Sequence, residues 1–229
     1  PSQLTRVSGD GQSAGPGQQL PDPLKVKVLD LSGQAIQGVS VKFGVLLNDG
    51  NIISTNPVKT DMYGIATATV VVGRTRGVNM YSAYLPDAPA ITTVSFTATT
   101  ENGEATRLTY VSGNDQSGTV NRTLALPLCV RTEDAYGNPV PNVPVNFAVV
   151  EDATVQAAGT LAGGLKASIV HSGGDGIACI TFTPGTRAGL NKVQATSAGL
   201  QPTNIVFSLY GKADYPYCMT DAKIGRAHV

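Results

Sequence analysis

The chain has 229 residues, and its 16 basic and 16 acidic side chains give it a formal net charge of zero. No run of either sign exceeds a few residues, so the sequence offers no basic surface for a nucleic acid or an anionic membrane. Charged residues make up 14% of the chain, below the ~25% usual for soluble domains. Thr, Ser, Asn, Gln and Gly must therefore supply the polar surface, which suits an extracellular β protein. No apolar stretch is long enough to predict insertion into a membrane.

An internal repeat organises the sequence. "LTRVSGDGQS" at residues 4–13 returns as "LTYVSGNDQS" at residues 108–117, a shift of 104 positions that continues without a gap for some forty residues. Further on, Gly73 matches Gly185 at a shift of 112, because the second copy carries a net eight extra residues between about 150 and 174. The chain thus contains two copies of a unit of about 100 residues, and each copy is large enough to bury its own core.

The repeat sets the predicted domain boundaries. The first domain spans residues 1–100, the linker 101–106 and the second domain 107–211. Residues 212–222 are interpreted as a tether or the start of a further module. The last seven residues, "KIGRAHV" at 223–229, back-translate into a widely used sequencing-adapter sequence. We interpret them as an artefact that packs on neither domain.

Period-two alternation marks the strands. "LKVKVLD" from Leu24 alternates apolar and polar residues, as a strand with one buried face does. Helical periodicity is absent, and 26 Gly and 14 Pro separate short strands. We therefore predict an all-β chain of two tandem immunoglobulin-like β-sandwiches with about seven strands each. The side chains expected to face the first core are Leu24, Val26, Val28, Val39, Val41, Phe43, Val45, Ala66, Ala68, Val70, Val94 and Phe96.

Two corresponding turns follow the "LKVKVLD" strand and its second copy. "DLSGQAIQG" and "DAYGNPVPN" each contain an Asp that can bond nearby backbone N–H groups and a Gly three residues later that can take positive φ. Together with the "L-T-x-V-S-G-x-x-Q-S" and "G-x-N-x-V-x-A" patterns, the second copy's "D-x-x-G-N-P-V-x-x-V-P-V-x-F" resembles the group 1 bacterial immunoglobulin-like repeat of invasin and intimin adhesins. The first copy departs from this pattern at Ser32, Gln34 and Ala35.

This resemblance covers about residues 3–210. It implies a non-enzymatic stalk of tandem sandwiches on a bacterial cell surface, which projects a distal binding domain. The partners it implies are neighbouring repeats of the same polypeptide, with a host surface protein or glycan bound through other domains. It also implies an outer-membrane anchor in a part of the protein beyond this chain.

The residue types that carry catalysis or metal binding do not form a recognisable pattern. "SGDGQS" has the glycines of a phosphate-binding loop, but a β segment and not a helix N-terminus follows it, so we predict a structural turn. His171 and His228 lie at no metal-ligand spacing, and no nucleophile-elbow pattern surrounds any Ser. The sequence therefore predicts no catalytic, metal or cofactor site.

The cysteines leave two alternatives open. Cys129 replaces Lys25 and Cys179 replaces Thr67, both on the outward phase of their strands, which excludes a buried bridge between sheets. If these strands are neighbours in one sheet, the two thiols can face each other on its outer surface and form a disulfide. Two unpaired thiols remain the other alternative, because a disulfide requires Cα atoms about 4.4 to 6.8 Å apart. Cys218 lies in the tail.

Two further functions compete with the stalk. The insertion at residues 151–174 could contact a glycan or host protein, although it has no Tyr or Phe and the chain has no Trp. Immunoglobulin-like domains also decorate phage virions, and the sequence does not separate that role from the stalk.

Overall fold

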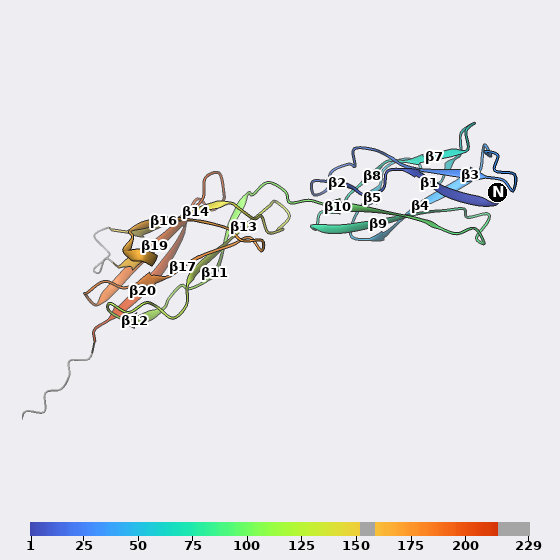
Figure 1. Ribbon diagram of the computed structural model, residues 1–229. Helices are drawn as coiled ribbons and strands as arrows, with labels where there is room; N and C mark the ends of the chain where they lie inside the picture. The colour runs from blue at the N-terminus through green and yellow to red at the C-terminus, as the bar shows by residue number, and fades with distance from the viewer. Residues whose placement is uncertain (152–158, 215–229) are drawn as a thin grey trace, which may run out of the picture. The chain divides into compact units, whose positions relative to one another are not determined.

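The computed structural model describes residues 1–151 and 159–214, which form two compact units (Figure 1). The first unit contains Pro1–Ala105 together with Glu133–Val140, and the second contains Thr106–Thr132 and the described chain from Pro141 onward. Apart from the short 3-10 turn η1 (Ala162–Gly164), every described element is a strand, which confirms the all-β prediction. The predictions for the segment 223–229, for most of 212–222, and for Cys218 and His228 fall outside the described residues.

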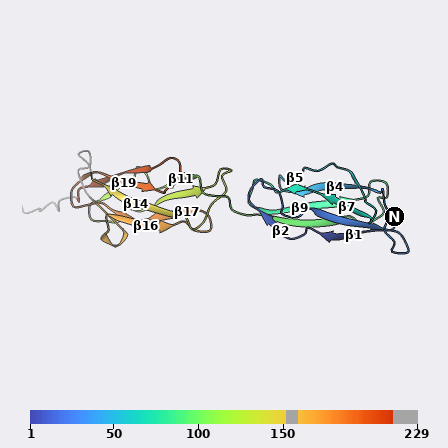
Figure 2. The same cartoon turned by 90° about the horizontal axis from the view of Figure 1, so that it is seen from above.

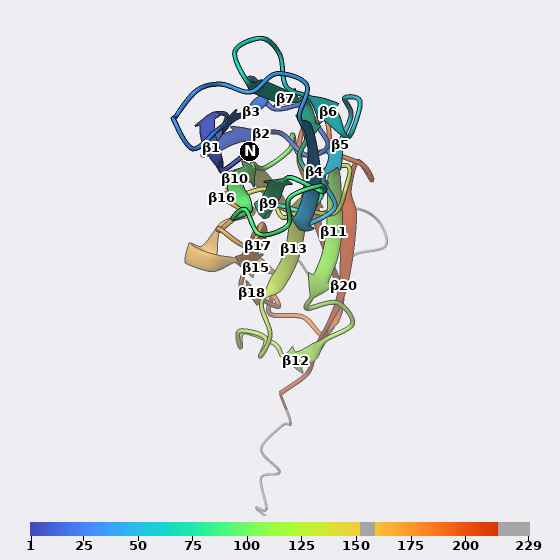
Figure 3. The same cartoon turned by 90° about the vertical axis from the view of Figure 1, so that its right-hand side faces the viewer.

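Two sheets face each other in the first unit, which is seen from further sides in Figures 2 and 3. One has the order β1-β3-β7, the other β2-β10-β9-β4-β6, and β5 pairs with β8 in a two-stranded ribbon. The strands are β1 (Gln3–Ser8), β2 (Gln12–Ala14), β3 (Leu24–Leu29), β4 (Ser40–Leu47), β5 (Asn51–Ile52), β6 (Val58–Lys59), β7 (Ile65–Ala68), β8 (Val70–Val71), β9 (Gly77–Tyr84) and β10 (Val94–Thr100).

The second unit repeats this topology strand for strand. Its sheets have the orders β11-β13-β17 and β12-β20-β19-β14-β16, and β15 pairs with β18. The strands are β11 (Arg107–Ser112), β12 (Ser117–Thr119), β13 (Leu128–Glu133), β14 (Pro144–Val150), β15 (Thr160–Leu161), β16 (Ala167–His171), β17 (Ile177–Ile180), β18 (Phe182–Thr183), β19 (Gly189–Thr196) and β20 (Ile205–Lys212). The repeat in the sequence is therefore a repeat of the whole fold.

The alternation predicted most of the first core correctly. Nine of the twelve residues expected to face inward are at most 1% exposed: Leu24, Val26, Val28, Val41, Phe43, Ala66, Ala68, Val70 and Phe96. Val39 and Val94 pack against this core and are partly buried. The prediction was wrong for Val45, which is 36% exposed. The pairing of β4 with β9 shifts register between Val45 and Leu47, and such a bulge ends the strict alternation on which the prediction relied.

The first strand of each unit passes from one sheet to the other at a glycine. β1 pairs antiparallel with β3, whereas β2 pairs parallel with β10. Between them Gly9 has φ of 97°, and a Cβ there would lie 2.6 Å from the carbonyl oxygen of Pro23. Gly113 in the second unit also has φ of 97° and is crowded by the backbone of Pro127. Only glycine accommodates both the left-handed φ and this close approach.

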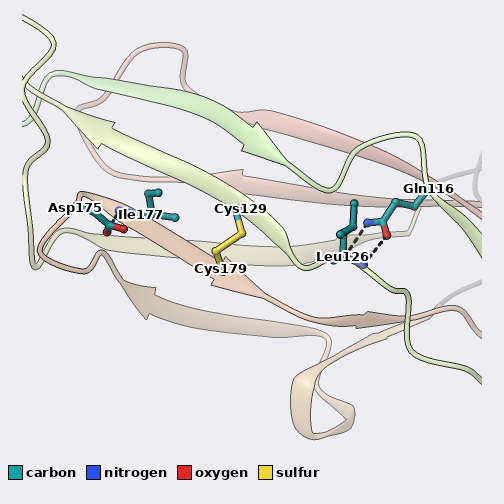
Figure 4. Close-up of a disulfide and its surroundings, with 6 residues drawn as sticks. All are labelled: Gln116, Leu126, Cys129, Asp175, Ile177 and Cys179. Atoms are coloured by element: carbon teal, nitrogen blue, oxygen red, sulfur yellow. Dashed lines mark hydrogen bonds between the residues drawn. A yellow bond between two sulfur atoms is a disulfide. The ribbon is translucent and has the colours of Figure 1, made fainter.

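A glutamine side chain holds the passage in place. Gln12 Nε2 donates to the carbonyl oxygens of Gly9 (2.7 Å) and Asp22 (2.9 Å), and Gln12 Oε1 accepts from Asp22 N–H (2.7 Å). Gln116 makes the same three bonds, to Gly113 O, Leu126 O and Leu126 N–H, and Figure 4 shows the pair with Leu126. The repeated "S-G-x-x-Q-S" sequence is therefore the device that transfers the first strand between sheets.

Substitutions within this motif should separate backbone crowding from simple loss of a glycine. We expect Gly9→Ala to destabilise the first unit by about 1–3 kcal/mol, because the new Cβ meets backbone at a φ that side chains rarely adopt. Gly11 also has positive φ, but its Cβ position is open, and Asp115 occupies the corresponding place in the second unit at φ of 56°. Gly11→Asp should therefore cost less than about 1 kcal/mol. Residue-resolved hydrogen exchange measures the loss of stability in both variants. Equal losses for Gly9→Ala and Gly11→Asp would contradict the role of backbone crowding at Gly9.

Candidate functional site

A disulfide joins two neighbouring strands of the second unit (Figure 4). Cys129 on β13 is paired in register with Cys179 on β17 in an antiparallel ladder. The Cα atoms lie 4.2 Å apart, just below the ~4.4 Å at which the usual range for disulfides begins, and the sulfur atoms lie 2.08 Å apart. Cys129 is only 5% exposed, while Cys179 is exposed. The bond lies within one sheet and does not connect the two sheets of the sandwich.

The first unit shows what the same position looks like without cysteines. Lys25 on β3 is paired with Thr67 on β7 in the register that Cys129 and Cys179 occupy in the second unit. The two ladders are otherwise alike, so the fold does not require the bond. We propose that the native protein forms the disulfide and that it stabilises the second unit alone.

Reduction should weaken only the second unit. The bond closes a loop with a sequence separation of 50, for which loop-closure entropy in the unfolded chain gives about 4 kcal/mol. In a Cys218→Ser background, dithiothreitol should lower the free energy of unfolding of the second unit and leave the first unchanged, as measured by residue-resolved hydrogen exchange.

The matched control for this experiment is the Cys129→Ser/Cys179→Ser variant. It should match the reduced protein and show no response to dithiothreitol. If reduction has no effect on the second unit of the unmodified chain, the disulfide is not formed in the native protein.

The polar groups of the "SGDGQS" motif are directed to the unit's own last strand. Asp10 Oδ1 accepts the backbone N–H of Thr97 (2.7 Å) and the Thr97 hydroxyl (3.0 Å), and its carboxylate pairs with Arg6. The backbone N–H of Thr97 is the largest cause that holds the pKa of Asp10 below its ordinary value. In the second unit Asn114 Oδ1 accepts Ser208 N–H at 2.7 Å. The motif therefore hydrogen-bonds to the last strand of its own unit. A phosphate-binding loop would be followed by a helix N-terminus, whereas this motif is followed by a strand.

The insertion is tied into the second unit at its described end. Gly159 N–H donates to Asn191 Oδ1 (3.1 Å), and Lys166 Nζ donates to Gly159 O (2.9 Å). In the first unit the corresponding Asn79 accepts from Gly73 N–H at 2.8 Å. In the second unit the hydrogen bond to this Asn side chain therefore comes from the insertion, through Gly159. In the first unit it comes from Gly73, in the loop before β9. Comparison of the two copies in the sequence did not predict this difference, although it aligned Asn79 with Asn191.

Histidine and acidic residues form no recognisable centre in the described part of the chain. His171 is exposed on β16. Within residues 1–151 and 159–214, no group of three or more His, Cys, Asp or Glu side chains could hold a metal ion. The same residues contain no helix long and apolar enough to cross a membrane.

A shallow apolar hollow of about 560 Å³ lies on the second unit. Pro144, Asn146, Ile169, Ser197, Leu200 and Thr203 contribute to its lining. The residues come from β14, β16 and the connection between β19 and β20. The described part of the insertion that precedes β16 does not line this hollow.

Comparison with known proteins found similar solved structures but no matching family model and no matching curated protein. FdeC, an Escherichia coli adhesin, is 21% identical with a TM-score of 0.46, over 91% of this chain and 64% of that one. InvD of Yersinia pseudotuberculosis is 15% identical with a TM-score of 0.45, over 93% of this chain and 57% of that one. The D00-D0 domain of intimin is 14% identical with a TM-score of 0.41, over 91% and 99%.

The similar structures thus include intimin and invasin, the adhesins whose repeat the sequence resembles. Domains of the surface-layer protein SbsC are also similar, at 14% identity with a TM-score of 0.39. These neighbours are named as adhesins, an integrin-binding protein and a surface-layer protein. This chain spans less than two thirds of FdeC and of InvD.

Proposed function

We propose that the two repeats are a non-enzymatic spacer in a bacterial cell-surface adhesin, which projects a distal binding domain from the cell. The observation that carries this proposal is the parallel pairing of the first and last strands in each unit. β2 runs parallel to β10, and β12 runs parallel to β20. Since β1 leads directly into β2, the chain enters each unit at one pole and leaves it at the other.

The pairings place entry and exit of the second unit at opposite poles. At the entry, Arg107 forms a parallel bridge with Gln201, which precedes β20. At the exit, the carbonyl oxygen of Lys212 at the end of β20 accepts from Val120 N–H (3.0 Å). Each repeat therefore advances the chain by roughly 30–40 Å, the extended length of the segment from the start of β1 to the end of β2 (residues 3–14). A unit whose two termini lay at the same end would not lengthen the spacer.

The same pairing suits a segment under tension. Pulling on the two ends draws β12 and β20 along their length in opposite directions, so their hydrogen bonds resist together in shear and do not open one at a time. In this proposal residues 101–106 are the linker, and the protein lies outside the cell, anchored in the outer membrane through another part of the polypeptide. Neighbouring repeats are its direct partners, and a host protein or glycan is bound by other domains.

A display experiment tests the spacer role. The chain is placed between an outer-membrane anchor and a binding domain of known receptor, and adhesion to receptor-coated surfaces is counted. Replacing residues 107–212 by a second copy of residues 3–106 should leave adhesion unchanged, because a spacer depends on reach and not on surface identity. Deleting both repeats should lower adhesion several-fold. If the replacement lowers adhesion as much as the deletion does, the second unit acts as a binding module.

The competing functions have their own signatures. Binding of the purified chain to host cells, lost when residues 151–174 are deleted, would favour a direct glycan- or protein-binding module. Tail or capsid genes beside this reading frame in the source DNA would favour decoration of a phage virion.

Single-molecule pulling should reveal how the disulfide limits extension. The bond prevents a loop with a sequence separation of 50 from extending under force. Fully extended, this loop has a length of roughly 175 Å. The contour length released by the second unit should therefore rise by about that amount when dithiothreitol is added. The first unit contains no cysteine, so its release should stay constant and serves as the internal control. Equal release from the second unit in both conditions would show that no disulfide shortens it.

A further inference from the structure

The loop Glu133–Val140 belongs to the first compact unit, although it follows β13 in the sequence. Asp134 is 1% exposed, and its Oδ1 accepts the backbone N–H groups of Tyr136 (2.8 Å) and Asn138 (2.9 Å). Burial alone would raise the pKa of Asp134, but hydrogen bonds from Asn138, Tyr136 and Gly103 N–H outweigh it and lower the pKa. The loop is thus held in one shape by an ionised carboxylate.

Asn138 uses its side-chain amide to bind a backbone segment inside this unit. Its Oδ1 accepts Arg76 N–H (2.9 Å), and its Nδ2 donates to Arg74 O (2.7 Å) and to Asp134 Oδ2 (2.8 Å). Arg74 also stacks over the Tyr136 ring at 5.5 Å from the centroid. The segment Arg74–Arg76 is the tip between β8 and β9. The amide recognises one N–H and one C=O of this tip, so the contact does not depend on the tip's side chains.

The first repeat contains the same loop in the same closed form. Asp30 Oδ1 accepts the backbone N–H groups of Ser32 (2.8 Å) and Gln34 (2.9 Å), and Asp30 N–H donates to Gln34 O (2.9 Å). The isolated bridge Leu29↔Ala35 corresponds to Glu133↔Pro139. In place of Asn138 stands Gln34, which carries the same amide on a side chain one methylene longer.

The Asp30–Ala35 loop differs from the Glu133–Val140 loop at its amide: Gln34 is exposed, whereas Asn138 is only 7% exposed. Leu31 is 95% exposed, the highest value among the large hydrophobic side chains of the described chain. Asp30, Leu31 and Ser32 line a hollow of about 300 Å³ together with Pro1 and Ser2. A preformed loop with an outward amide and an uncovered leucine has the features of a docking surface.

We propose that the Asp30–Ala35 loop is a docking site for the tip of a further copy of this repeat, with Gln34 in the role of Asn138. The corresponding tip of the second repeat is Gly185–Gly189, whose residues Thr186–Ala188 are exposed. Ala188 N–H and Thr186 O take the places of Arg76 N–H and Arg74 O. We call the docking loop the socket. Because the socket and the tip are different surfaces of one repeat, the contact is head-to-tail and can continue from repeat to repeat.

The proposal deepens the spacer function and rests on it for the presence of another repeat. The test adds residues 107–217 ahead of Gln3 in the full chain, with the added repeat alone ¹⁵N-labelled by ligation and Cys218→Ser throughout. Tethering raises the effective concentration of the tip at the socket, so a weak contact becomes measurable. The readout is the hydrogen-exchange rate of Ala188 N–H in the added repeat.

We expect Ala188 N–H to exchange at least tenfold more slowly there than in the original two-repeat chain. Gln34→Ala in the accepting repeat should abolish the slowing, and Gln34→Asn should preserve it. The positive control is Arg76 N–H of the two-repeat chain, whose exchange should accelerate in Asn138→Ala. An Ala188 exchange rate that does not change when Gln34→Ala is introduced overturns the docking proposal.

The two proposals fail separately. Unprotected Ala188 together with unchanged adhesion in the display experiment would remove the docking site and keep the spacer. Protected Ala188 together with lost adhesion after replacement of the second unit would keep the docking site and remove the spacer.

Discussion

The transfer of the first strand from one sheet to the other is the constraint on which the rest of each unit depends. Without the passage at Gly9, β2 could not reach β10, and the first and last strands would not run in parallel. The passage requires a backbone conformation and a close approach that only glycine allows. Gln12 then satisfies the carbonyl and N–H groups that the crossing removes from the ladders. A unit whose two ends lie at opposite poles follows from this one local device.

The second repeat keeps that device and changes what surrounds it. Its ladder between β13 and β17 carries a disulfide where the first repeat has Lys25 and Thr67. Its insertion supplies Gly159 as the donor to Asn191, a role that Gly73 has in the first repeat. Both changes fall where the shared fold tolerates them: on the outer surface of a sheet and in a connection between strands. Both leave the strand order of the unit unchanged.

The Asx-closed loops show how one motif can serve two purposes. Asp30 and Asp134 close their loops with the same pair of backbone bonds. That closure is local and would exist in either repeat alone. Asn138 uses the resulting shape to bind backbone groups more than sixty positions away. The loop motif thereby becomes a recognition element. Side-chain amides suit this task because they match the donor and acceptor pair of a peptide.

Local patterns in the sequence determined the repeat, the all-β class, the inward-facing residues of most strands and the outward phase of Cys129 and Cys179. Each depends on spacing along one strand or on comparison of the two copies, and neither requires knowledge of distant contacts. Tertiary structure alone decided that the two cysteines face each other in register, since that depends on how two strands fifty positions apart are aligned. It also decided that Val45 is exposed, because a bulge arises from pairing with a partner strand. Only the folded chain shows that Asn138 binds Arg74 and Arg76, because a side-chain hydrogen bond is set by the positions of both partners in space.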